Sequence, residues 1–153
     1  MTLQLTTKES GLLKDAKGQE ELCIRKYEDY AERAKSPALA SLFRQMADTE
    51  RTHLTTICEM MGGTVTPVSG PLTGKNNDLA TPYTYPTDAD KQADCFLCQD
   101  MLATEKHASS LYDTSVFEFE SPVARKVLNH IQAEEQQHGE QLYAYMKANG
   151  MYN

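Results

Sequence analysis

Proline and glycine are concentrated in one stretch of the 153-residue sequence. Residues 62–87 hold four of the six prolines and four of the eight glycines, and their apolar residues show no helical periodicity. The sequence on either side is rich in Leu, Ala, Met, Glu, Lys and Gln, which favour helix. We therefore expect two helical halves joined by one long connection.

Each helical half divides again at a Ser-Pro pair, Ser36-Pro37 in the first and Ser121-Pro122 in the second. Serine is a favoured N-cap residue, and proline is well suited to the first position of a helix. Two further helix starts and two helix ends are marked by capping residues, namely Thr6, Thr87, Gly62 and Gly150. These signals predict helices over residues 7–35, 37–61, 88–120 and 122–149.

The lengths of the connections predict how the four helices pack. The short joints make two antiparallel hairpins, 7–61 and 88–149, whereas residues 62–87 can return along a helix about 37 Å long. This pattern favours an all-α, antiparallel four-helix bundle with one long crossover between the second and third helices. The length of the chain is typical of a single domain, which we expect to span residues 1–153.

The charge of the chain argues against several classes of partner. It carries 22 acidic and 15 basic side chains, a formal net charge of −7. Without a basic cluster it would be repelled by nucleic-acid phosphates and by anionic membrane surfaces. No apolar run approaches the roughly 20 residues that span a bilayer, and the first ten residues lack the features of a secretory signal. We therefore expect an intracellular protein.

In that compartment thiols stay reduced, so disulfides are not expected among the four cysteines. Cys95-x-x-Cys98 is weak evidence for a zinc or redox site, because no second pair accompanies it. Burial in a helix is the better interpretation of these two residues.

The two halves are related by an internal repeat. When the second half is placed on the first at an offset of 85 residues, the two Ser-Pro joints coincide, and nine residues are identical. Three of the matched pairs are glutamate or histidine: Glu20 with Glu105, Glu50 with Glu135, and His53 with His138. The repeat therefore indicates a duplicated helical hairpin that has retained acidic and histidine side chains.

These six ionisable residues interrupt the apolar face of every predicted helix. In residues 37–61, for example, one stripe with 3-4 spacing consists of Leu39, Phe43, Met46, Glu50, His53, Ile57 and Met60. Burying four carboxylates together is unfavourable unless their charge is cancelled. Two divalent cations would cancel it, and two Glu plus two Glu-x-x-His units from four helices form the ligand set of a dinuclear carboxylate site.

The sequence thus predicts two divalent metal ions bound by Glu20, Glu50, His53, Glu105, Glu135 and His138, with no catalytic residues apart from these ligands. The alternative is a bundle that keeps the same residues as protonated, hydrogen-bonded core groups. Tyr27 and Tyr112 follow the outer glutamates by seven residues, and we expect them in the core or hydrogen-bonded to a ligand carboxylate. Several ionisable residues lie off the stripes and are predicted to be solvated: Glu21, Glu28, Glu134, His107 and His130.

With this residue pattern, the sequence resembles the ferritin-like superfamily, and specifically its rubrerythrin-type di-iron bundles. More narrowly, DMLATEKHASSLYDTSVFEFESP and NHIQAEEQQHGEQLYAYM resemble the coat F family of spore coat proteins from endospore-forming bacteria. The resemblance covers about residues 8–149. It implies that Glu50 and Glu135 bridge two metals, that Glu20 and Glu105 are terminal ligands, and that each metal takes one of the two histidines.

The resemblance also has implications for function. It implies iron, with manganese as an alternative, and reaction of Fe(II) with oxygen or peroxide. The rubredoxin module of full rubrerythrins is missing, because one CxxC cannot form a four-cysteine iron site. Coat F proteins are chiefly structural, so a spore coat or assembly protein with a stabilising or vestigial metal site is the alternative function. Expected partners are a second copy of the chain and spore coat proteins, in the mother-cell cytoplasm or the coat.

Overall fold

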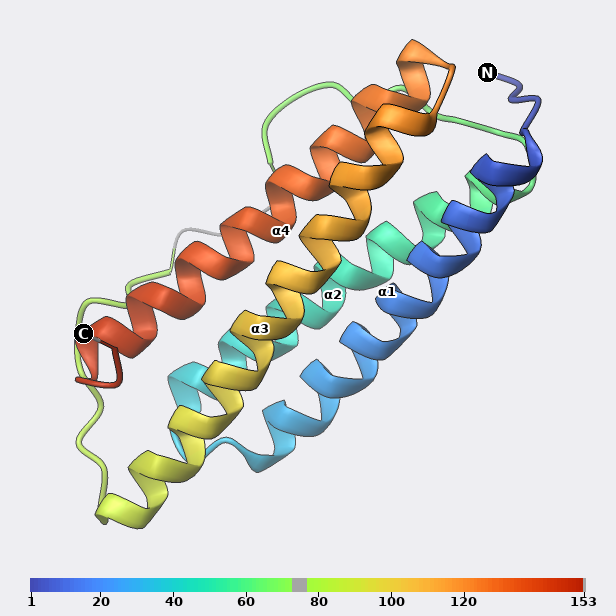
Figure 1. The fold of residues 1–153 in the computed structure, drawn as a ribbon. Coiled ribbons are helices and arrows are strands. Elements are labelled where there is room, and N and C mark those ends of the chain that lie inside the picture. The colour runs from blue at the N-terminus through green and yellow to red at the C-terminus, as the bar shows by residue number, and fades with distance from the viewer. Residues whose placement is uncertain (73–76, 153) are drawn as a thin grey trace.

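The computed structural model describes residues 1–72 and 77–152 and consists of four long α-helices (Figure 1). Their bounds are α1 Thr7–Arg33, α2 Pro37–Met61, α3 Asp88–Glu118 and α4 Pro122–Ala148. All four predicted helices are confirmed, and each observed end lies within two residues of the predicted one. The described residues contain no strand beyond an isolated antiparallel bridge between Thr2 and Thr64.

The helices begin at the capping residues that the sequence predicted. The Thr6 hydroxyl accepts a hydrogen bond from the Glu9 backbone N–H, and the Glu9 carboxylate accepts one from the Thr6 N–H. Ser36, Ser121 and Thr87 each accept a bond from a backbone N–H three residues later. These caps satisfy backbone N–H groups that the first turn of a helix leaves without intrahelical partners.

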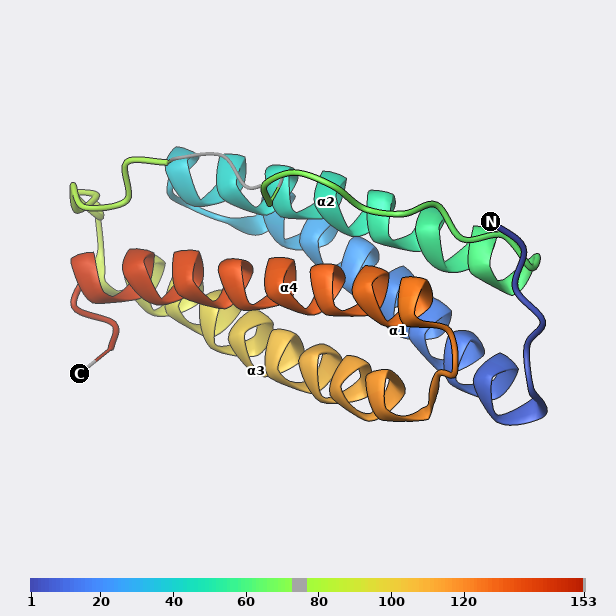
Figure 2. The ribbon, with the colours of Figure 1, turned by 90° about the horizontal axis from the view of Figure 1, so that it is seen from above.

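The helices form two antiparallel hairpins, α1–α2 and α3–α4, that pack against each other as a four-helix bundle (Figure 2). The connection between α2 and α3 returns along the outer side of α2, as predicted; residues 73–76 of the expected crossover 62–87 lie outside the described part. Asn77 in this crossover donates a hydrogen bond to Gln45 of α2 at 2.9 Å. Near its end, the Tyr83 N–H donates to the Asn149 side chain at the end of α4, also at 2.9 Å.

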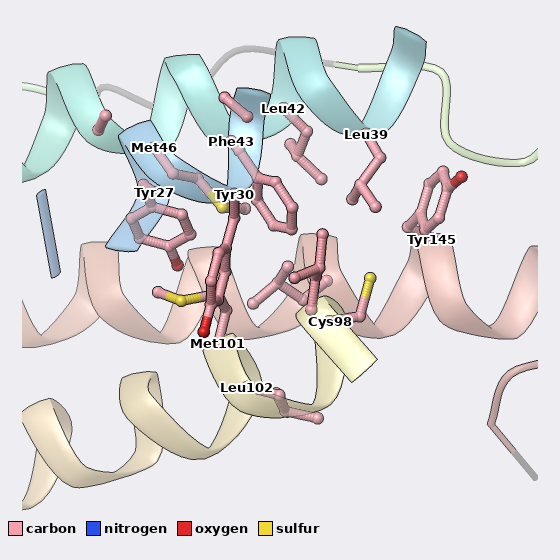
Figure 3. Packing of buried hydrophobic residues seen from close by; sticks show 14 of the residues in the cluster. Tyr27, Tyr30, Leu39, Leu42, Phe43, Met46, Cys98, Met101, Leu102 and Tyr145 are labelled. Atoms are coloured by element: carbon pink, nitrogen blue, oxygen red, sulfur yellow. The ribbon is translucent and has the colours of Figure 1, made fainter. Parts of the chain in front are cut away.

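The apolar core is divided into two clusters, one toward each end of the bundle. The cluster near the α1–α2 joint contains Tyr27, Phe43, Met101 and Tyr145, whose side chains converge between the helices in Figure 3. The cluster at the other end includes Leu13, Ile57, Tyr112 and Leu128. Along every helix, the predicted metal ligands fall between the residues of the two clusters. The centre of the bundle is therefore polar, with an apolar cluster at either side.

Each hairpin contributes one buried carboxylate that accepts hydrogen bonds from the turn of the other hairpin. Asp94 of α3 accepts hydrogen bonds from the N–H groups of Lys35 (2.8 Å) and Ser36 (3.0 Å) in the α1–α2 joint. Glu9 of α1 accepts one from the N–H of Glu120 (2.9 Å) in the α3–α4 joint. Glu9 and Asp94 occupy equivalent positions in the 85-residue repeat. Equivalent residues of the two repeats therefore make the hydrogen bonds that join the hairpins.

None of the helices in residues 1–72 and 77–152 is both long and apolar enough to cross a bilayer. The four thiols are free. Cys98 is buried in the core, as predicted, whereas Cys95 is only half-buried.

Candidate metal centre

The structure brings the six predicted ligand residues together in the middle of the bundle. They form two overlapping groups in which one ligand atom per residue lies within 4.8 Å of the others: Glu20, Glu50, His53 and Glu135 in the first, and Glu50, Glu105, Glu135 and His138 in the second. All six side chains are buried. Because Glu50 and Glu135 belong to both groups, they are the two residues placed to contact both metal ions of a dinuclear site.

Helix geometry explains why the residues converge. Glu50 and His53 are three positions apart on α2, as are Glu135 and His138 on α4, so both side chains of each pair project from one face. The other two helices contribute one glutamate each, at positions that the repeat makes equivalent. Each hairpin thus supplies two carboxylates and one imidazole.

The ring of His53 has one nitrogen directed toward the cluster. Its Nδ1 lies 2.9 Å from Glu135 Oε1. It also lies 3.7 Å from Glu20 Oε1 and 3.7 Å from Glu50 Oε1. Its Nε2 lies 2.9 Å from Glu134 Oε1. A ring held at Nε2 presents Nδ1 in a fixed direction, which is the usual arrangement of a histidine that binds metal.

His138 is oriented in the same way on the opposite side. Its Nδ1 lies 3.0 Å from Glu50 Oε1 and 3.2 Å from Glu105 Oε1. The rings of His138 and His53 are separated by 6.5 Å, with an angle of 28° between their planes. Each histidine also contacts a glutamate from the other hairpin, so the cluster depends on docking of the two hairpins.

Five buried carboxylate oxygens have no hydrogen-bond partner among the described residues. They are Oε2 of Glu20, both oxygens of Glu50, Oε2 of Glu105 and Oε2 of Glu135. An unsatisfied polar atom in a protein interior costs about 1–3 kcal/mol, and more when it is charged. Oxygen and imidazole ligands of this kind suit iron, manganese or zinc. The donor set therefore fits a pair of divalent cations, which would give the free oxygens partners.

The electrostatics of the cluster follow from burial and from contact between like charges. Burial raises the pKa of Glu50 well above its ordinary value, and the negative charge of Glu20 raises it further. The pKa of Glu135 is raised in the same way by burial and by Glu105. Without cations, these two central carboxyls bind protons, because four adjacent charged carboxylates are too unfavourable.

The outer carboxylates remain ionised more easily. Burial opposes ionisation of Glu20, but its contacts with Glu50 and His53 lower its pKa below the ordinary value. Likewise, contacts with Glu135 and His138 outweigh burial and lower the pKa of Glu105. The cluster therefore pairs a protonated central carboxyl with a charged outer one on each side.

Tyr27 and Tyr112 both reach an outer carboxylate, and each does so across the hairpins. The Tyr112 hydroxyl of α3 donates a hydrogen bond to Glu20 Oε1 of α1 at 2.6 Å. The Tyr27 hydroxyl of α1 donates one to Glu105 Oε1 of α3. Burial raises the pKa of both phenols, and the glutamate charges raise it further, so the hydroxyls stay protonated and act as donors.

Glu134 was predicted to be solvated, and this prediction is wrong. The residue is 2% exposed, and its side chain lies against His53 Nε2. Glu134 is three residues after Ile131 and four before His138, so it lies at the edge of the buried stripe of α4 and faces α2. The position of Glu134 directly before a Glu-x-x-His unit is the one sequence signal that could have identified it.

The remaining polar residues near the centre differ in exposure. Glu21, Glu28 and His107 are exposed, as predicted. His130 is only partly exposed, and its Nε2 lies 3.4 Å from Glu134 Oε1, so it is not an ordinary surface histidine. Cys23 is buried beside the cluster; burial and the nearby glutamate charges raise the pKa of its thiol, which favours the neutral form.

Comparison with protein families gives one match. Residues 93–153 match the family described as the Coat F domain. Comparisons with curated proteins and with solved structures give no match. The matched segment contains most of α3 and all of α4, including Glu105, Glu135 and His138. Residues 93–153 are therefore similar to the Coat F domain, in agreement with the resemblance found in the sequence.

Proposed function

We propose that this chain is a di-metal carboxylate protein of the spore coat F type, with two divalent cations, iron first and manganese as the alternative, bound in the middle of the bundle. The observation that carries the proposal is the set of five buried carboxylate oxygens without hydrogen-bond partners. Protonation of Glu50 and Glu135 relieves the charge of the empty cluster, whereas two divalent cations would give all five oxygens partners and would leave the carboxylates ionised.

The arrangement of the six residues supports a role for each. Glu50 and Glu135 belong to both groups and would be shared by the two cations. Glu20 with His53, and Glu105 with His138, would complete one cation site each. The four carboxylates carry as much negative charge as two divalent cations carry positive charge, so the loaded centre is close to neutral.

When iron is bound, the pair supplies two electrons, enough to reduce one hydrogen peroxide with two protons to two waters while two Fe(II) become Fe(III). The residues of the chain control the surroundings of that chemistry. Tyr27 and Tyr112 hold the outer carboxylates in place through hydrogen bonds that cross the hairpins. The apolar clusters on either side keep bulk water from the centre along the bundle axis.

Metal analysis and iron oxidation test the proposal. Protein purified without chelator is expected to hold about two metal ions per chain, and less than about half an equivalent would contradict a dinuclear site. Addition of Fe(II) followed by peroxide or oxygen is then expected to give a ferric absorption band. Glu50→Ala and Glu135→Ala should lose that reaction, whereas Glu21→Ala, which changes an exposed glutamate next to a ligand, should retain it. Oxidation at the parental rate in Glu50→Ala would refute a catalytic centre.

The second candidate function is a structural coat protein in which the metal only stabilises the fold. The Coat F domain favours it, and so does an aromatic pair at the surface, where the rings of Tyr143 and Tyr152 lie 4.0 Å apart. These two phenols are available for contact with other coat proteins or for cross-linking, whereas Tyr145 is buried and hydrogen-bonded to Tyr85. Full metal occupancy without iron oxidation would favour this function. A homodimer is part of either proposal, and sedimentation of the loaded chain tests it.

A further inference from the structure

The internal repeat is broken by smaller residues at two positions beside the proposed centre. At the offset of 85 residues, Leu54 of α2 corresponds to Gly139 of α4, and Ile24 of α1 corresponds to Ser109 of α3. Leu54 directly follows the ligand His53, and Gly139 directly follows the ligand His138. At these two positions the α3–α4 side of the bundle carries a small residue where the α1–α2 side carries a large apolar one.

The small residues coincide with a pocket that reaches the centre. Between α3 and α4 lies a pocket of about 380 Å³ whose lining includes Leu102, Ser109, Gly139, Tyr143 and the ligand residues Glu105 and Glu135. Water occupies about 30 Å³ per molecule in the liquid, so this volume exceeds that of any diatomic molecule or peroxide many times. The pocket therefore extends from the surface of the bundle to one outer and one central ligand residue, whose carboxylates are buried behind it.

The α1–α2 side of the bundle has a pocket of its own at a different level of the helices. It is lined by Glu28, Ala47, Arg51 and neighbouring residues, and its lining includes none of the six ligand residues. Arg51 forms ion pairs with Glu28 and Asp48 there. Of these two pockets, the one between α3 and α4 is the one whose lining includes residues of the proposed centre.

The backbone does not account for the glycine at position 139. Gly139 lies inside α4 and has no positive φ, so its conformation suits any residue. A Cβ atom added there would lie 3.8 Å from Leu102 Cδ1, an ordinary van der Waals contact. Alanine therefore fits and would stabilise the helix interior. What glycine adds at this position is open space next to the ligands.

We propose that Gly139 and Ser109 form the entrance through which small uncharged molecules, of the size of dioxygen or hydrogen peroxide, reach the metal centre, and that the side chain at position 139 sets the size limit. The inference rests on the proposed function. Three glutamates line the pocket, Glu105, Glu135 and Glu140, against the single cation Lys106, and this excess of acidic residues disfavours the entry of anions.

Two substitutions that introduce the larger residues of the α1–α2 hairpin test the entrance. Gly139→Leu and Ser109→Ile introduce the residues that the fold already carries at the equivalent positions Leu54 and Ile24. Both variants should bind two Co(II) per chain with parental stoichiometry and oxidise bound Fe(II) at least tenfold more slowly than the parent. Gly139→Ala should oxidise iron within about twofold of the parental rate. Gly18→Leu is the matched control, because Gly18 lies within α1, is exposed and has no atoms near its added Cβ.

A second measurement needs no metal. Crystals of the metal-free parent under xenon pressure should show a xenon atom between Leu102 and Gly139, and crystals of Gly139→Leu should not, because apolar cavities of sufficient size bind xenon. Parental oxidation rates in both closing variants, with metal bound, would overturn the entrance and leave the metal centre intact. Failure of the parent to bind metal would instead overturn the proposed function. In that case, the absence of xenon from the parent crystals would also overturn the entrance.

Discussion

Metal binding should stabilise the folded chain. The amount should depend on whether one or both of the two groups of ligand residues in the bundle are intact. A ligand that binds only the native state stabilises it by about 2.7 kcal/mol per site at one hundred times its dissociation constant. The two groups of the centre would together contribute about 5 kcal/mol under those conditions. For a chain of this length each kcal/mol raises the melting temperature by about 2–4 °C, so saturating metal should raise it by about 10–20 °C.

Glutamine substitutions separate the contributions of the two groups. Glu50 belongs to both groups, so Glu50→Gln should lose most of the metal-dependent shift, whereas Glu20 belongs to one, and Glu20→Gln should lose about half. The metal-free Glu50→Gln variant should be as stable as the metal-free parent. The reason is that burial and the Glu20 charge already raise the pKa of Glu50, so a neutral amide replaces a neutral carboxyl.

The assay is thermal unfolding followed by circular dichroism, with Mn(II) in one sample and a chelator in the other, so that no redox chemistry intervenes. Glu21→Gln is the control for a general effect of removing an acidic side chain, because Glu21 is exposed beside the ligand Glu20. An unchanged melting temperature of the parent in saturating Mn(II) would refute the metal centre. If Mn(II) raised the melting temperature of Glu50→Gln as much as that of the parent, Glu50 would not be a ligand of both cations.

Two further predictions concern residues that support the centre and the fold. Glu134→Ala removes the partner of His53 Nε2 and should weaken metal affinity about 10- to 100-fold, whereas Glu134→Gln retains an acceptor and should restore most of it; equal calorimetric affinities for parent and Glu134→Ala would contradict this role. Burial opposes ionisation of Glu9, but hydrogen bonds from Thr6 and Glu120 outweigh it and lower its pKa below 4.5. The carboxylate thus contributes stability that is fully present above pH 4.5 and is lost as the pH falls through the folded-state pKa. The unfolding free energy of Glu9→Gln in urea should therefore change less between pH 6 and pH 3 than that of the parent, and equal slopes would count against this contribution.

The fold was predictable because its signals are local. Each helix start is set by a side chain that caps its own first turn, and this information lies within four residues of sequence. The crossover was predictable from the concentration of Pro and Gly in residues 62–87. The convergence of the six ligand residues followed from the same periodicity, since residues three apart on a helix share a face wherever the helix packs.

Contacts between the hairpins were less predictable, because they depend on docking. Whether Glu134 is buried depends on how α4 is rotated relative to α2. The apolar pattern of α4 alone does not specify that rotation. Glu9 and Asp94 occupy equivalent positions in the repeat, but one is Glu and the other is Asp. A search for identical residues therefore does not identify this pair. Only the structure reveals that each of these two carboxylates holds the turn of the opposite hairpin.

The same crossed arrangement determines what the Coat F segment can do by itself. Residues 93–153 supply Glu105, Glu135 and His138, which is half of the proposed ligand set. Both tyrosine bonds to outer carboxylates and both carboxylate bonds to the turns run between this hairpin and residues of the other. A complete pair of the proposed metal sites would therefore require both hairpins, and the first hairpin, which lies outside the matched segment, supplies the other three of the six proposed ligands. The two halves differ at one position beside the pocket: the α1–α2 hairpin carries Leu54, and the α3–α4 hairpin carries Gly139, which lines the pocket between α3 and α4.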